Sequence, residues 1–129
     1  MRWLFLDTHV RGQAVFGWLA EEKAAVWTYE GRGNGLLSAL ARRCAPRDIA
    51  AAQGICVVSG PGPFSAIRIG VLVANLMART FGLPLHAVAA DQAVDLQKLA
   101  ASLARQEVPA VQYAAPVYDS EPNITLPKT

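Results

Sequence analysis

The sequence predicts an α/β fold, and two features of the chain indicate it. Residues 2–29 contain three short apolar runs separated by brief polar turns, which is typical of an antiparallel meander. The rest of the chain alternates apolar runs of strand length with segments whose apolar residues recur every three or four positions. We therefore expect three antiparallel strands followed by strand–helix units.

The expected strands of the meander are residues 2–7, 13–20 and 24–29. The first is an apolar run that ends in an acid, and the second is rich in Val, Phe and Trp. The third follows a charged turn at residues 21–23. Connections this short join antiparallel neighbours.

Two helices alternate with two further strands in the middle of the chain. Residues 36–44 have helical spacing of apolar residues, and Pro46 is expected to end this first helix. Residues 55–59 are continuously apolar, as expected of a central strand. The second helix, residues 65–81, stops before Gly82 and Pro84, and residues 85–89 form another buried strand.

The last elements are a third helix and a tail. The helix is expected over residues 91–107, with Asp91 as its N-cap. Four prolines follow from residue 108 onward, so residues 108–129 are interpreted as an extended C-terminal tail beside a domain of residues 1–107. With right-handed crossovers between the parallel strands, this order is the ribonuclease-H-like arrangement, which each lobe of the actin-like and heat-shock-chaperone ATPases uses. The chain has room for a single lobe.

Composition narrows the function classes. The formal charge of +2 is too small to predict nucleic-acid binding by itself, and no run of basic residues exceeds Arg42-Arg43. No signal peptide or membrane span is expected, so the chain is interpreted as cytoplasmic with two reduced thiols. Hydrophobic residues make up 53% and charged residues 17% of the chain. This composition indicates either a surface that a protein partner covers or an alanine-rich chain in which alanine raises the hydrophobic count.

The turn after the central strand has two interpretations. Gly60, Pro61, Gly62 and Pro63 stand between an apolar run and a helix. Phosphate binding would need free backbone N–H groups at the helix start, and prolines have none. The local chemistry favours a rigid structural turn over a phosphate site.

The second helix is apolar over most of its circumference, which predicts burial on more than one side. One side is expected to face the sheet, and the other to join the first helix in a protein interface with an arginine rim. The alternative is that the third helix covers this patch within the chain. The predicted interface residues are Leu36, Leu37, Leu40, Arg43, Arg68, Leu72, Asn75, Leu76 and Arg79.

Three stretches resemble the TsaB (YeaZ) family. "ICVVSGPGPFSAIRIG" is similar to that family's Gly-Pro-Gly signature, "FLDTHVRGQAVFGWL" to its opening strands, and "FGLPLHAVAADQAV" to the segment after its second helix. The match runs in order from residue 2 to about residue 95. The chain departs from the signature at residues 63–67, and typical members carry a second lobe of comparable size, so the resemblance implies a shortened member.

The resemblance implies a noncatalytic scaffold without a cofactor. TsaB-type proteins bind the related catalytic subunit TsaD through the first two helices of each N-terminal lobe. With TsaE, that complex makes N6-threonylcarbamoyladenosine in tRNAs reading codons that start with A, so tRNA is an indirect partner. Family members also form homodimers.

Asp7 carries the alternative hypothesis. In the superfamily an acid at the end of the first strand helps to place Mg²⁺ and nucleotide, so the chain could be a nucleotide-binding half-enzyme that dimerises to complete its site. One carboxylate without a facing lobe is a poor Mg²⁺ site, so the residues favour the interpretation that Asp7 closes the first hairpin together with Thr8. No metal site is expected, because His9 and His86 are the only histidines and are far apart in sequence.

Overall fold

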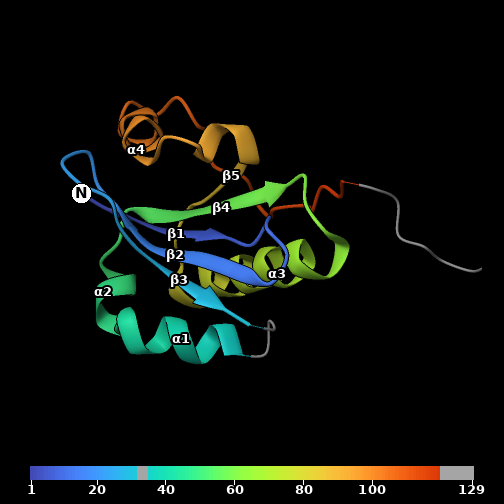
Figure 1. Cartoon of the computed structure of the whole chain (residues 1–129). Helices are drawn as coiled ribbons and strands as arrows, with labels where there is room; N and C mark the ends of the chain where they lie inside the picture. Colours follow the sequence, from blue (N-terminus) through green and yellow to red (C-terminus); the bar gives the residue numbers. More distant parts are fainter. Residues whose placement is uncertain (32–34, 120–129) are drawn as a thin grey trace, which may run out of the picture.

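The computed structural model describes residues 1–31 and 35–119, which form a mixed five-stranded sheet covered by helices on both faces (Figure 1). The strands and helices occur in nearly the predicted order and positions. The elements are β1 (Trp3–Asp7), β2 (Gln13–Leu19), β3 (Ala25–Glu30), α1 (Leu36–Arg43), α2 (Pro46–Ala50), β4 (Gly54–Gly60), α3 (Phe64–Phe81), β5 (Leu85–Ala89), the 3₁₀ helix η2 (Ala90–Ala93) and α4 (Leu96–Ala104).

The sheet has the order β3-β2-β1-β4-β5. β2 pairs antiparallel with both β1 and β3, and β4 pairs parallel with both β1 and β5. The predicted antiparallel meander followed by parallel strand–helix units is therefore confirmed. β1 lies at the centre of the sheet, and β3 is one of its edges.

Alternation along the strands builds two separate cores. Leu4 and Leu6 of β1 face α1, α2 and α3, whereas Trp3 and Phe5 face α4. All four side chains are 5% exposed or less. A strand whose two sides are both buried reads as a continuous apolar run, which is why the sequence marks β1 and β4 clearly.

The third helix differs from the prediction. The expected helix over residues 91–107 is split into η2 and α4, and Asp95 rather than Asp91 is the N-cap of α4. The Asp95 carboxylate accepts a hydrogen bond from the backbone N–H of Lys98 at 3.1 Å. Starting the helix there turns Leu99 and Leu103 toward the sheet, where both are buried.

The expected connection at Pro46 is also wrong. Residues Pro46–Ala50 form the short helix α2, with proline at its first position. The backbone N–H groups in the first turn of a helix have no partner within the helix. Proline has no N–H, so it loses nothing at this position and can start a helix as well as end one. Ile49 of α2 is buried in the core beneath α1 and β1.

Helix α3 packs along the sheet through one face only. Its length of 18 residues and mean hydropathy of 1.3 would suffice for a membrane span, but core helices pass the same test. Ile67, Val71 and Ala74 are 3% exposed or less. At Gly70 a β-carbon would lie 2.1 Å from Thr8 Oγ1, so glycine lets α3 approach β1 closely.

Both cysteines are buried thiols in the reduced state. Burial raises the pKa of Cys56 to about 12, and the nearby Asp7 carboxylate adds to the rise. Burial also raises the pKa of Cys44. Thiolates are the reactive form, so both residues are structural rather than nucleophilic.

We expect neither thiol to react with a disulfide reagent at pH 8 until the chain is unfolded, when both should react. The unfolded Cys56 thiol ionises at a lower pH than the folded one. Above about pH 9 the unfolded state therefore loses the Cys56 proton while the folded state keeps it. The contribution of Cys56 to the free energy of unfolding is constant below about pH 8 and declines as pH rises from about 9 toward 12. Rapid labelling of the native protein would contradict this assignment.

Candidate functional site

The predicted interface residues of α1 do not lie on one surface. Leu36 and Leu40 are 1% and 4% exposed and belong to the core with Phe16 and Ile67, whereas Leu37 is 59% exposed. The expectation that Leu36 and Leu40 are contact residues is therefore corrected. In a helix of eight residues, the rotation about its axis decides which leucine faces the sheet.

On α3, Leu72 and Leu76 are 56% and 55% exposed. They stand one helical turn apart, opposite the face that packs on β4. α3 and α1 cover the same face of the sheet. We call Leu37, Leu72 and Leu76 the helix-pair surface.

Three arginines were predicted to surround this surface, and they occupy different places. Arg68 and Arg79 are exposed on α3, at helical spacing from Leu72 and Leu76. Arg43 lies on another flank: its guanidinium carbon is 5.3 Å from the centre of the Trp27 ring on β3. Two arginines rather than three are thus available to the helix-pair surface.

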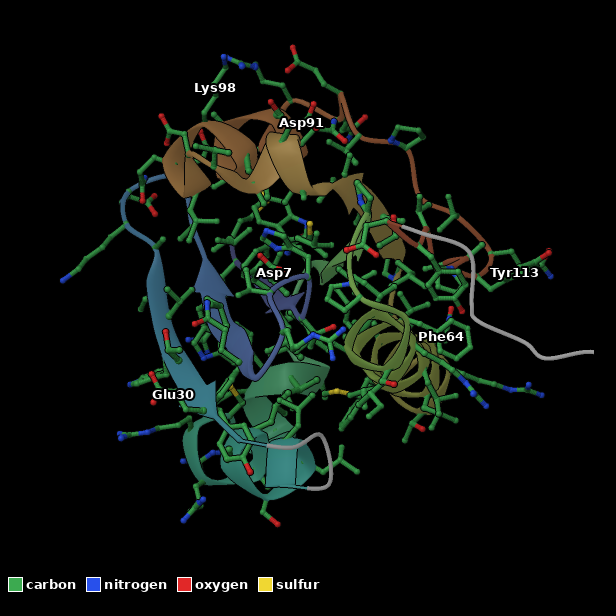
Figure 2. The ribbon with its side chains drawn as sticks, turned by 45° about the vertical axis from the view of Figure 1, so that its right-hand side comes forward. Asp7, Glu30, Phe64, Asp91, Lys98 and Tyr113 are labelled. Atoms are coloured by element: carbon green, nitrogen blue, oxygen red, sulfur yellow. The ribbon has the colours of Figure 1, made fainter. Side chains whose placement is uncertain are left out.

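Asn75 holds the chain's own C-terminal segment, which we define as residues 108–119. Its side-chain amide donates to the Ala114 carbonyl at 3.0 Å, and its oxygen accepts from the Ala114 N–H at 2.8 Å. The ring of Tyr118 lies 4.7 Å from that of Phe64. Figure 2 shows Phe64 at the start of α3. The segment thus covers one flank of α3, and Asn75 is not free for a partner.

We expect Asn75→Leu to destabilise the fold by about 2 kcal/mol, because it removes both hydrogen bonds and leaves the Ala114 backbone unpaired. Asn75→Asp keeps the acceptor and loses the donor, so it should cost less. Urea titration measures the stabilities, and hydrogen exchange at Ala114 reports the docking of the segment. Unchanged protection in Asn75→Leu would show that the pair does not hold it.

The glycine-proline turn is also occupied by the C-terminal segment. The Gly62 N–H donates to the Val117 carbonyl at 3.2 Å, the Val117 N–H to the Ser59 carbonyl at 2.8 Å, and the Asp119 N–H to the Gly62 carbonyl at 3.0 Å. Pro61 and Pro63 have no N–H to offer. The turn therefore presents its backbone to this segment and keeps no N–H cluster for a phosphate.

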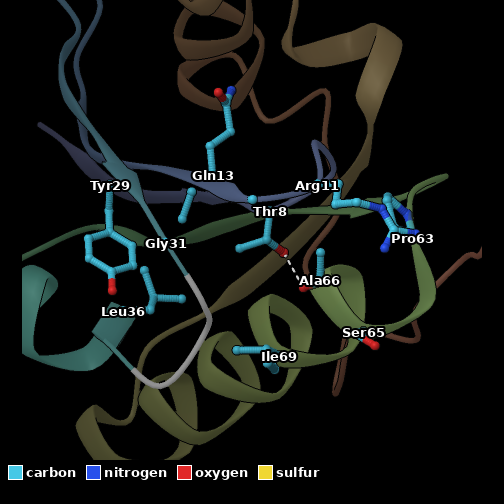
Figure 3. Close-up of a pocket in the computed structure, with 12 residues that line it drawn as sticks. Thr8, Arg11, Gln13, Tyr29, Gly31, Leu36, Pro63, Ser65, Ala66 and Ile69 are labelled. Atoms are coloured by element: carbon cyan, nitrogen blue, oxygen red, sulfur yellow. Dashed lines mark hydrogen bonds between the residues drawn. The ribbon is translucent and has the colours of Figure 1, made fainter.

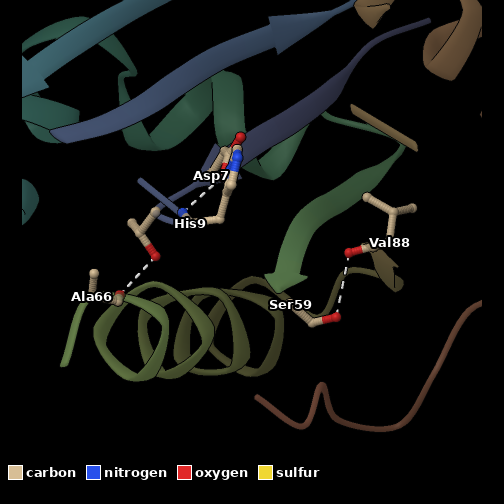
Figure 4. Close-up of polar contacts among 6 residues, drawn as sticks. Asp7, His9, Ser59, Ala66 and Val88 are labelled. Carbon is tan, nitrogen blue, oxygen red and sulfur yellow. Dashed lines mark hydrogen bonds and ion pairs between the residues drawn. The ribbon is translucent and has the colours of Figure 1, made fainter. Parts of the chain in front are cut away.

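Asp7 is bonded within its own hairpin. Its Oδ1 accepts from the backbone N–H of His9 at 2.9 Å and lies 2.6 Å from His9 Nδ1 (Figure 4). The neighbouring Thr8 hydroxyl donates to the Ala66 carbonyl at 2.7 Å and so fastens β1 to α3. Both side chains are thus used in holding the turn after β1.

A cavity of about 520 Å³ opens beside this turn, between the starts of α1 and α3 (Figure 3). Leu36 and Ile69 line it from the two helices, and Thr8 and Arg11 from the turn after β1. Asp7 is not among its lining residues. The cavity and the Asp7 carboxylate are therefore separate features.

Within residues 1–31 and 35–119, no three His, Cys, Asp or Glu side chains gather as a metal site would require. His86 instead contacts the Val108 carbonyl through Nδ1 at 2.9 Å, and so joins β5 to the C-terminal segment. Two features had no sequence signal: the Asn75–Ala114 pair, whose partners are 39 residues apart, and the packing of Arg43 on Trp27. Both depend on the tertiary fold.

The strand order and the helices on both faces define an α/β domain, whose fold is similar to that of YeaZ-type solved structures. A family model described as TsaD, tRNA N6-adenosine threonylcarbamoyltransferase, matches residues 38–114, which is more than half of the chain. The chain belongs to this family. The predicted resemblance to YeaZ-type proteins of tRNA modification is confirmed in the solved structures that match.

YeaZ from Pseudomonas aeruginosa is similar with a TM-score of 0.59 and 24% identity, over 68% of this chain and 43% of that chain. A second Pseudomonas aeruginosa structure, described as an uncharacterised protein with similarity to peptidase YEAZ, matches with a TM-score of 0.55 and 25% identity. It is covered to the same extent, 68% of this chain and 43% of that chain. This chain thus spans less than half the length of these proteins. No curated protein matches it.

Proposed function

We propose that this chain is a noncatalytic subunit in the synthesis of N6-threonylcarbamoyladenosine in tRNA, and that it binds and stabilises a TsaD-type catalytic subunit. The observation that carries the proposal is the helix-pair surface: three leucines, each more than half exposed, on one helical layer. Large exposed apolar side chains gathered on one layer mark a protein contact. The family match supplies the process in which that contact serves.

The contact has an apolar centre and a basic edge. Leu72 and Leu76 form the centre on α3, Leu37 extends it onto α1, and Arg68 and Arg79 set the orientation of the partner. Arg43 and Asn75 are excluded from it, because Arg43 lies on the flank of α1 that faces Trp27 of β3 and Asn75 binds Ala114. In this proposal the C-terminal segment lies beside the leucines, on Asn75 and Phe64, and leaves Leu72 and Leu76 more than half exposed.

The catalytic role is assigned to the partner. Asp7, the residue on which the nucleotide-binding alternative depends, is bonded to His9 and does not line the neighbouring cavity. We further propose that the domain is a single ribonuclease-H-like lobe of the actin-like superfamily, supported by its strand order, and that it works in the cytoplasm with TsaE in the larger complex.

The test mixes the purified chain with TsaD from the same genome and measures the mass by light scattering. The expected product is a 1:1 heterodimer whose mass is the sum of the two chains. A chain that stays monomeric, or forms only a homodimer with no TsaD bound, would overturn the proposal. Addition of TsaE to the heterodimer should then raise the mass again.

A further inference from the structure

A second surface lies at the other side of α1, where the helix runs along the edge strand β3. A cleft of about 640 Å³ separates them, which we call the β3–α1 cleft. Its lining residues are Phe16, Trp27, Thr28, Tyr29, Ala39, Arg42 and Arg43. Figure 1 shows α1 beneath β3, on the side of the molecule away from α4.

The rim of the cleft is positively charged. Arg42 and Arg43 are exposed, and neither is in an ion pair with any carboxylate of residues 1–31 or 35–119. The one acid of α1 and α2, Asp48, is instead 3.5 Å from Arg2. The small net charge of the chain thus conceals a local excess of arginine around α1.

The floor of the cleft is aromatic. Trp27 is half-buried, 6.1 Å from Phe16 and 5.3 Å from the Arg43 guanidinium carbon. β3 carries one carboxylate, Glu30, and strand alternation places it on the opposite face from Trp27. No negative charge of β3 therefore competes for the two arginines.

This combination selects the chemistry of a ligand. Guanidinium groups are donors only, so the ligand must supply acceptors with negative charge, and phosphates match their fork geometry. A tryptophan beside arginines is the pairing on which unpaired bases stack. An acidic polypeptide would satisfy the charges but would leave the aromatic floor without a flat partner.

We propose that the β3–α1 cleft is an RNA-contact site, in which Arg42 and Arg43 bind phosphates and Trp27 stacks with an unpaired base that takes the place of the Arg43 guanidinium on its ring. The inference rests on the proposed function in tRNA modification, because that function supplies tRNA as the RNA present. It changes the role of this chain from a scaffold alone to a subunit that also touches the substrate. The cleft and the helix-pair surface lie on different flanks of α1, so TsaD and RNA can bind together.

Fluorescence anisotropy with a labelled, unmodified tRNA anticodon stem-loop tests the proposal on the full chain. The double variant Arg42→Ala/Arg43→Ala should bind about tenfold more weakly, and its log–log salt slope should fall by about 1.4 to 1.8, because two phosphate contacts are lost. The matched control is Arg68→Ala/Arg79→Ala, which removes the same charge from α3. It should bind like the unchanged chain.

Two further measurements distinguish base stacking from phosphate binding, and an RNA ligand from an acidic polypeptide. Trp27→Leu should weaken stem-loop binding about tenfold without changing the salt slope, and a blunt RNA duplex should bind more weakly than the stem-loop. Circular dichroism shows that each variant is folded. Equal binding and equal slopes for both arginine pairs would overturn the proposal, as would full displacement of the stem-loop by an equimolar acidic peptide.

The result of the stem-loop binding experiment does not depend on the contact with TsaD. Arg42→Ala/Arg43→Ala should still form the heterodimer with TsaD, because these side chains lie outside the helix-pair surface. Loss of the heterodimer in this variant would contradict the separation of the two sites. A chain that binds the stem-loop but never TsaD would overturn the proposed function and leave the RNA site standing.

Discussion

Leu72→Glu is expected to abolish formation of the heterodimer with TsaD, weakening it by more than about 100-fold. Leu72 is 56% exposed at the middle of the α3 stripe, between Arg68 and Leu76. In the complex this position would be apolar and closed to water, so a carboxylate there would be buried without a partner. Co-purification of tagged TsaD with each variant, followed by titration calorimetry, measures the effect.

The variant itself should fold normally. Glutamate is a good helix former, and an exposed side chain outside the core changes stability by about 0.5 kcal/mol or less. The matched control is Val94→Glu, since Val94 is 84% exposed and lies beside α4 on the opposite face of the sheet. If the Leu72→Glu variant binds TsaD as tightly as the Val94→Glu variant does, the TsaD contact lies on another surface of the chain.

The sequence predicts the centre of the sheet well because β1 and β4 are buried on both faces. Continuous apolar runs at β1 and β4 are unambiguous signals of central strands. The start of α4 is a weaker signal, because Asp91 and Asp95 are both acceptable N-caps and only packing against β2 and β4 selects Asp95. Pro46 is similar, since proline is compatible with either end of a helix.

The candidate site is predicted only in part. Leu36, Leu37, Leu40 and Ala41 define two overlapping stripes on α1, and periodicity does not show which stripe the sheet buries. On the long helix α3 many turns agree, so the exposure of Leu72 and Leu76 follows from the pattern more securely. Asn75 looks like part of the same polar stripe, and only the path of the distant C-terminal segment shows its internal role.

The second large effect is expected at the glycine-proline turn, where Gly60→Ala should destabilise the fold by about 2–4 kcal/mol. Gly60 has a φ of +126°, which residues with a β-carbon rarely adopt. An added β-carbon would also lie 2.1 Å from the Val117 carbonyl oxygen. The C-terminal segment would have to leave the turn, with the loss of the hydrogen bonds from Val117, Gly62 and Asp119.

Gly82→Ala is the control that separates backbone strain from displacement of the segment. Gly82 also has a positive φ, +65°, but no atom lies within 4 Å of its added β-carbon. It should therefore cost only about 1 kcal/mol. Hydrogen exchange at Val117 and Asp119 distinguishes the two variants: protection should vanish in Gly60→Ala and persist in Gly82→Ala. If both variants lose the same stability and keep that protection, the turn serves only to connect β4 with α3, and the segment is held by its other contacts, among them Asn75–Ala114 and His86–Val108.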